Sequence, residues 1–198
     1  TPRYMDYTES KPDADIPKRF FLFIGQIKLR KGWDTALEAM ARLKKEGKGD
    51  AHLVFVTPFK DMSEPIAYAR KLDILPSVTF LSAVSNEEKS WLLTHCTYVL
   101  IPSRYEGFGL VVFEAFLAKK PVCATTIRSF LEFLEDRKNA MLYAPGDSEG
   151  LAHAVSALDA DLGLQKTLVE EGARTAERFN YNRMVDAYVN LFDSLGRS

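Results

Sequence analysis

The sequence of 198 residues has little cysteine, no long apolar run and no excess of charge of either sign. The two cysteines, Cys96 and Cys123, lie in apolar, strand-like surroundings, so we expect buried, reduced thiols rather than a disulfide or a metal pair. No apolar stretch reaches the roughly 18 residues that cross a membrane, and we expect no signal peptide. The net charge of −1 gives no reason to expect nucleic acid as a partner.

The remaining composition is that of an ordinary globular protein, with 46% hydrophobic residues. This is enough for one domain with a sizeable core. Residues 1–18 are polar and contain proline, and we interpret them as a linker or domain-boundary segment before a single domain over 19–198. Because the chain starts at Thr1 rather than methionine, we expect it to be a piece of a longer protein. We expect that protein to be located in the cytoplasm.

Apolar, strand-like runs alternate six times with segments that have helical periodicity. The strands are predicted at Phe20–Ile24, His52–Thr57, Val78–Leu81, Tyr98–Ile101, Pro121–Thr125 and Ala140–Tyr143. The helices are predicted at Trp33–Lys45, Ser63–Leu72, from the capping box at Ser85 to His95, after Gly109, and at Ser129–Leu134, Asp147–Ala160, Leu164–Arg178 and Asn182–Leu195. This alternation predicts an α/β fold, a doubly wound parallel six-stranded sheet with helices on both faces.

The most informative stretch runs from Ile101 to Ala115 and reads Ile-Pro-Ser-Arg-Tyr-Glu-Gly-Phe-Gly-Leu-Val-Val-Phe-Glu-Ala. It is predicted to be strand, loop and helix, with two glycines before the helix. Unpaired N–H groups at a helix start and close backbone approach at glycine favour an anion site. Glu106 and Glu114 lie about 12 Å apart along a helix axis, too far for a paired-carboxylate hydrolase but suitable for holding two ends of one extended ligand.

This stretch resembles the E-x7-E motif of retaining glycosyltransferases of family 4 (group 1). The family pattern is roughly P-S-x-x-E-G-F-G-L-x-x-x-E-A, and the chain matches it at every fixed position. The resemblance covers about residues 20–195. It implies the C-terminal, donor-binding domain of such an enzyme, which is the Rossmann-like half of a GT-B fold.

The resemblance also implies roles for the residues of the motif. Glu106 falls at the catalytic position near the transferred sugar, and we interpret it as a sugar-positioning residue. Glu114 would accept hydrogen bonds from the nucleotide ribose. Sugar and phosphate would contact the backbone N–H groups of Gly107, Phe108, Gly109 and Leu110.

The loop after the first strand resembles the family's G-R-L-x-x-x-K-G, in which the arginine and lysine bind the donor diphosphate. Gly25 and Lys31 match it, whereas Gln26 stands at the arginine position. Loss of a charge-assisted contact there would weaken diphosphate binding by about 1–3 kcal/mol. Lys28 or Arg30 could supply the missing charge.

Several glycines that are usual in the family are absent. The substitutions fall at Thr57-Pro58-Phe59, at Ser82, at Lys119 or Lys120, at residues 127–130 and at Asn139-Ala140. These glycines give the base and sugar room, so the identity of the donor stays open.

The parent protein is thus expected to transfer a sugar from a nucleoside-diphosphate sugar to a sugar or lipid-linked acceptor, without a metal or another cofactor. Its other partners would be its own N-terminal domain and, peripherally, a membrane. His52, His95 and His153 lack the spacing of metal ligands. One alternative is a non-catalytic nucleotide-binding or assembly module that lost donor binding. A GT-B epimerase or phosphorylase is a weaker alternative, because no motif supplies a convincing pyridoxal-phosphate lysine.

Overall fold

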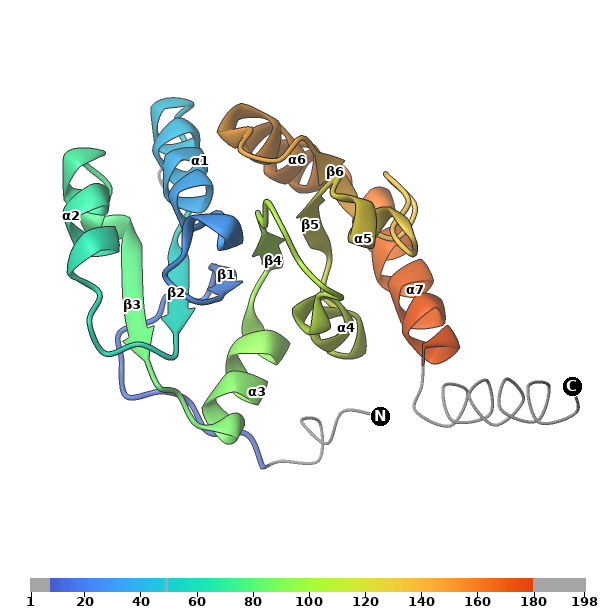
Figure 1. Cartoon of the computed structure of the whole chain (residues 1–198), viewed down its shortest axis with the longest axis horizontal. Coiled ribbons are helices and arrows are strands. Elements are labelled where there is room, and N and C mark those ends of the chain that lie inside the picture. The colour runs from blue at the N-terminus through green and yellow to red at the C-terminus, as the bar shows by residue number, and fades with distance from the viewer. Residues whose placement is uncertain (1–7, 49, 180–198) are drawn as a thin grey trace, which may run out of the picture.

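The computed structural model describes residues 8–48 and 50–179, and its strands form one parallel sheet (Figure 1). The order is β3-β2-β1-β4-β5-β6, with every neighbouring pair parallel. This confirms the doubly wound, Rossmann-like sheet. The strands are β1 Phe21–Ile24, β2 Leu53–Thr57, β3 Val78–Ser82, β4 Tyr98–Ile101, β5 Val122–Thr125 and β6 Met141–Tyr143.

The central strands are apolar along their whole length because both faces of the sheet are covered. In β1 the sequence Phe-Leu-Phe-Ile places Phe21 and Phe23 in one core and Leu22 in the other. Phe21 pairs with Leu53 of β2 on one side and with Tyr98 of β4 on the other. The first strand is therefore the centre of the sheet.

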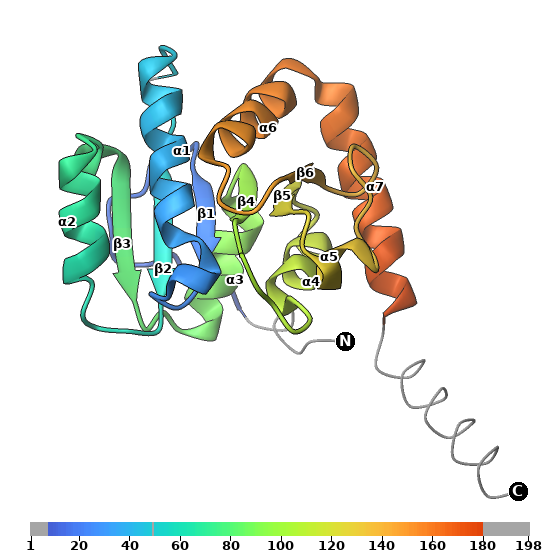
Figure 2. The same ribbon diagram turned by 45° about the horizontal axis from the view of Figure 1, so that its top comes forward.

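The helices cover both faces. Helices α1, α2 and α6 pack over one core and α3, α4 and α5 over the other, and Figure 2 shows α6 beside α1. The helices are α1 Trp33–Lys45, α2 Ser63–Lys71, α3 Asn86–His95, α4 Leu110–Leu117, α5 Arg128–Leu131, α6 Ser148–Ala160 and α7 Leu162–Arg178, with short 3-10 turns η2 Leu29–Lys31 and η3 Leu75–Ser77.

The predicted boundaries were mostly within two residues of these. The helix predicted at residues 129–134 was wrong at its end, because α5 stops at Leu131 and the chain continues in turns. The two 3-10 turns were not predicted. The capping box at Ser85 and Glu88 is confirmed, since each side chain accepts a hydrogen bond from the backbone N–H of the other. The helix predicted at residues 182–195 lies outside the described residues.

Residues 8–18 contain neither helix nor strand, and they contact the domain at several points. Ile16 is buried in the core with α3 and α4. The Thr79 hydroxyl donates to the carbonyl of Asp15 at 3.2 Å, and the N–H of Ser10 donates to the carbonyl of Glu87 at 3.3 Å. This segment is thus anchored along the side of the sheet near β3.

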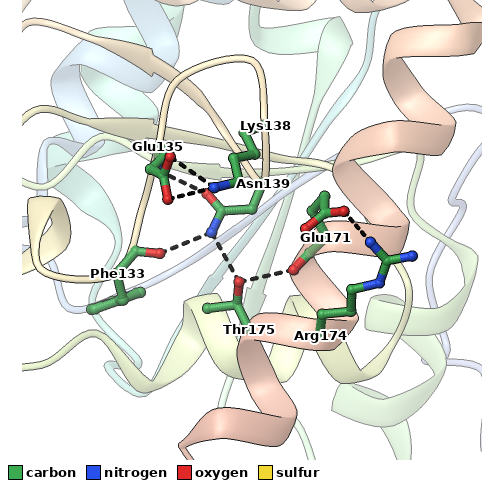
Figure 3. Close-up of polar contacts among 7 residues, drawn as sticks. All are labelled: Phe133, Glu135, Lys138, Asn139, Glu171, Arg174 and Thr175. Carbon is green, nitrogen blue, oxygen red and sulfur yellow. Dashed lines mark hydrogen bonds and ion pairs between the residues drawn. The ribbon is translucent and has the colours of Figure 1, made fainter.

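Helix α7 is tied to the turn before β6 by one asparagine (Figure 3). The Asn139 amide donates to the carbonyl of Phe133 at 2.8 Å and to the Thr175 hydroxyl at 3.0 Å. Its carbonyl accepts from the N–H of Glu135 at 2.8 Å. The hydroxyl of Thr175 donates in turn to the carbonyl of Glu171. A buried amide with every contact satisfied fixes the helix against the turn.

Helix α4 ends in a Schellman motif whose left-handed residue is a lysine. The N–H of Lys120 donates to the carbonyl of Ala115 at 2.9 Å, and the N–H of Lys119 donates to that of Phe116 at 3.0 Å. Lys119 has φ +56°, the conformation that favours glycine here. Lys119 and Lys120 were both candidates for the position of the missing family glycine. Lys119 is the one that has the backbone conformation typical of glycine.

A similar position follows β3. Ser82 is an ordinary strand residue, whereas Ala83 has φ +51°. The family glycine that the chain lacks is predicted at Ser82, and the left-handed residue in the structure is its neighbour Ala83.

Both cysteines are free and buried, as predicted. Burial raises the pKa of Cys96 to about 12 and raises that of Cys123 further. Trp33 is also buried and packs its ring edge-on against Tyr68. The tryptophan next to the first loop is therefore a core residue.

Candidate functional site

The candidate site lies where the chain order of the sheet reverses, between β1 and β4. In open parallel sheets, ligands bind beyond the carboxyl ends of the strands at such a switch point. The loop of residues 25–32 follows β1, and the loop of residues 102–109 follows β4. The sheet order therefore brings the two loops that the sequence singled out to one place.

These two loops are joined by their backbones. The carbonyl of Arg30 accepts from the N–H of Arg104 at 2.8 Å and from that of Tyr105 at 3.3 Å. Gly32 has φ +69°, and a Cβ on it would lie 1.8 Å from the carbonyl oxygen of Pro102. Only glycine satisfies both the backbone conformation and the close packing.

Arg104 adds a side-chain connection between the same loops. Its guanidinium makes two 2.7 Å contacts to the Asp34 carboxylate in the first turn of α1 and one to the carbonyl of Leu29. The hydrogen bonds to Asp34 raise the pKa of Arg104. Such paired contacts have defined geometry, so Arg104 fixes the path of the loop that carries Glu106.

Lys31 and Glu106 meet at the junction of the loops. The Lys31 ammonium donates to Oε1 of Glu106 at 2.5 Å, and the Ser103 hydroxyl donates to the same oxygen at 3.0 Å. The side chains of Lys31 and Glu106 are 19% and 13% exposed. The carbonyl of Ser103 accepts from the Thr125 hydroxyl at the end of β5, which ties this group to the sheet.

Gln26 lies at the start of the first loop and contacts a cation. Its Oε1 accepts from the guanidinium of Arg30 at 3.0 Å. Gly25, before it, has no room for a side chain, since a Cβ would lie 2.9 Å from the ring of Phe23. The structure therefore places the charge of Arg30 next to the neutral residue that replaces the family arginine.

Gly109 caps the start of α4 with φ +84°. A Cβ there would lie 2.4 Å from the ring of Phe130. No side chain caps this helix start. Around Gly107 there is open space, and Leu110 is 60% exposed. The backbone from 107 to 110 is thus accessible to a ligand. The side chain of Phe108 stacks on Phe113, with ring centroids 4.9 Å apart.

Glu114 lies inside α4 and is only 5% exposed. Its Oε1 accepts from the ammonium of Lys89 in α3 at 2.7 Å. Its other oxygen, Oε2, is buried and accepts no hydrogen bond from the described residues. A buried carboxylate oxygen normally has a partner, so this atom is a candidate ligand contact.

A hollow of about 350 Å³ opens beside Glu106, between the second loop and α5. The second loop contributes Arg104, Tyr105 and Glu106 to its lining, and the segment around α5 contributes Ile127, Arg128, Ser129 and Glu132. Arg128 is exposed in the stretch where the family has glycines. The lining therefore includes a carboxylate and a guanidinium from each of these two segments.

The two glutamates of the motif thus each have a lysine from a different part of the chain. The sequence predicted Lys31 and Glu106 at one site, and the structure brings them into contact. It did not predict Lys89, Ser103 or Arg104 as partners. Lys89 follows directly after the capping box that fixes the start of α3. This capping box was the only feature of the sequence that could have pointed to Lys89.

Several solved proteins have the same fold. HepE from Anabaena superposes with a TM-score of 0.77 at 22% identity, over 88% of this chain and 48% of that one. The C-terminal domain of the group 1 glycosyl transferase LpcC from Francisella tularensis superposes with a TM-score of 0.68 at 26% identity, over 81% of this chain and 85% of that one. The fold is that of one domain of a GT-B glycosyltransferase.

Sequence comparison shows the family to which the chain belongs. The model of the glycosyl transferases group 1 matches residues 6–175, and the chain belongs to this family. Glycogen synthase of Mycobacterium tuberculosis is 28% identical over 172 residues, which are 86% of this chain and 41% of that protein. The chain spans 41–48% of the length of the first curated relatives that it matches.

Within residues 8–48 and 50–179, no group of three or more His, Cys, Asp or Glu side chains is placed to hold a metal ion. In the same part of the chain, no helix has the length and apolar character needed to span a membrane.

Proposed function

We propose that this chain is the donor-binding half of a retaining glycosyltransferase that uses a nucleoside-diphosphate sugar. The observation that carries the proposal is the buried Oε2 of Glu114, an acceptor without a donor in the described protein. It lies in α4, and the loop that leads into this helix has open space around Gly107. A carboxylate accepts well from a diol, and a ribose offers one.

Each part of the ligand would have its own contacts. The diphosphate would lie at the open backbone of residues 107–110, with Lys31 as its cation. The transferred sugar would occupy the hollow beside Glu106, where that carboxylate would accept hydrogen bonds from its hydroxyls. The nucleotide ribose would contact Glu114. Lysine and backbone N–H groups would carry the leaving-group charge in place of a metal.

Transfer would need a second domain. The chain spans about half the length of its curated relatives. We propose that an N-terminal domain, absent from this sequence, binds the sugar or lipid-linked acceptor and completes the active site. Alone, the chain would bind the donor and transfer nothing.

The choice of base is the open part of the proposal. HepE, which shares the fold, has been crystallised with UDP and with UDP-glucose. UDP is therefore the first nucleotide to test, with GDP and ADP beside it. Gln26 and Arg30 bear on the affinity for the diphosphate, not on the base.

The test is calorimetric titration of the chain with these three nucleotides. We expect one of them to bind and Glu114→Gln to weaken binding at least about tenfold, since a hydrogen bond to a charged group contributes about 1.5–3 kcal/mol. Glu149→Gln, on the exposed surface of α6, is the matched control and should bind normally. Absence of binding at millimolar concentration of all three would contradict the proposal and favour the non-catalytic module.

The transfer step is tested on the longer parent protein. We expect the product to keep the anomeric configuration of the donor, as judged by the proton coupling of the anomeric carbon in NMR spectra. Activity should persist in EDTA. An inverted product, or loss of activity in EDTA with recovery on adding Mg²⁺, would refute the retaining, metal-independent part of the proposal.

A further inference from the structure

The carboxylate of Glu114 is held by protein at one of its two oxygens. Lys89 donates to Oε1 at 2.7 Å, and Oε2 accepts nothing from the described residues. The two side chains are 19% and 5% exposed, so this ion pair lies largely out of solvent. A carboxylate gripped at one oxygen has a defined orientation, and its second oxygen has a defined direction.

The position of Lys89 in α3 is unfavourable for the helix dipole. It follows the capping box of Ser85 and Glu88, so its charge lies near the positive end of the α3 dipole. Glu87 and Glu88 in the same turn suit that dipole, whereas a lysine does not. The side chain instead crosses to α4 and meets Glu114.

A largely buried ion pair also contributes little to the free energy of folding. Removal of two charges from water costs about as much as their attraction returns, and apolar side chains of the same size often serve better. An ion pair retained in such a place is better explained by what it orients.

We propose that Lys89 is a positioning residue that sets the preference of this site for a ribonucleotide. It holds Oε1 of Glu114, so that Oε2 faces the place where the ribose hydroxyls bind. The inference rests on the proposed function and deepens it. The capping box of α3 contributes, because it fixes the turn from which Lys89 reaches Glu114.

The experiment compares two forms of one ligand. The nucleotide among UDP, GDP and ADP that binds best is titrated together with its 2′,3′-dideoxy counterpart. We expect the unmodified chain to prefer the ribonucleotide by at least about tenfold, as two hydrogen bonds to a carboxylate predict. In Lys89→Met this preference should fall below about threefold, because the ribonucleotide loses affinity and the dideoxynucleotide does not.

Two further variants separate orientation from folding. Lys89→Arg keeps the charge and the hydrogen bond and should keep most of the preference. Lys71→Met, at the exposed end of α2, removes an equivalent charge far from the site and should change nothing. Thermal melting of each variant without ligand reports folding, and Lys89→Gln replaces Lys89→Met if the latter does not fold.

The outcomes decide between the two proposals. If Lys89→Met weakens the two ligands equally, or leaves their ratio unchanged, the role of Lys89 is overturned. If Glu114→Gln removes the preference in the same series, the proposed function still stands. If the unmodified chain binds none of the nucleotides, the proposed function is refuted, and the inference about Lys89 is refuted with it.

Discussion

Lys119 offers a test of the backbone in which one substitution should stabilise the protein. It is the left-handed residue of the Schellman motif after α4, with φ +56°. A non-glycine residue in this conformation costs about 1–2 kcal/mol. Glycine removes that cost but loses about 0.5–1 kcal/mol through the freedom of the unfolded chain. Lys119→Gly should therefore stabilise the protein by about 0.5–1 kcal/mol.

The neighbouring lysine provides the control. Lys120 has no positive φ, so Lys120→Gly removes the same charge and gains nothing in the folded state. It should destabilise by about 0.5–1 kcal/mol. Urea unfolding measures both free energies, and thermal melting should show a rise of about 1–4 °C for Lys119→Gly and a fall for Lys120→Gly. A shift of the same sign in both variants would refute the reasoning, because it would trace the effect to charge.

Three further predictions concern packing, pH and thiol reactivity. Gly32→Ala should destabilise the protein by about 3 kcal/mol or more, because the added Cβ would lie 1.8 Å from a backbone carbonyl oxygen. Gly47 has φ +81° but nothing within 4 Å of an added Cβ, so Gly47→Ala should cost only about 1 kcal/mol. Urea unfolding measures both, and equal costs would show that φ alone matters. Burial lowers the pKa of His52 below 6.5, so the unfolded chain takes up the proton first. The free energy of unfolding should fall as pH drops below 6.5, and His52→Gln should flatten that dependence; an unchanged slope would exclude His52 as its source. Burial raises the pKa of Cys96 to about 12 and that of Cys123 further. Neither thiol should react with Ellman's reagent until urea unfolds the chain, and fast labelling in buffer would contradict their burial.

Periodicity was enough to predict the architecture. Continuous apolar runs such as that of β1 are typical of strands in a parallel sheet that is covered on both faces. The six alternations then left few arrangements, and the observed strand order is one of them. Helix ends were harder to predict, because α5 ends through a change to tighter turns that no residue type marks.

The candidate site was predictable within each loop but not between loops. The motif with Glu106 and Glu114 is local, and so is the pattern that contains Lys31. The contact between Lys89 and Glu114 joins residues 25 positions apart in two helices, and it depends on how α3 packs beside α4. Pattern reasoning places side chains on faces and cannot give the partner across a packed interface.

The left-handed positions show the same limit. Two adjacent lysines were equally good candidates for the missing glycine, since no side-chain preference separates them. The hydrogen bonds that close α4 separate them at once, because only Lys119 donates to Phe116 and carries the positive φ. Backbone conformation at a non-glycine residue leaves little trace in the sequence.

The ion pair between Lys31 and Glu106 has a consequence for competition among anions. The charge of Lys31 is already compensated by Glu106, and both side chains are mostly shielded from solvent. Inorganic phosphate or sulfate would have to take Lys31 from Glu106 and leave that carboxylate without its cation. A nucleotide sugar of the proposed kind brings the phosphate for Lys31 and, in the same molecule, hydroxyl donors for Glu106. The site would thus discriminate against simple anions, because binding one of them would leave Glu106 unpaired. Common buffer salts should therefore be weak inhibitors.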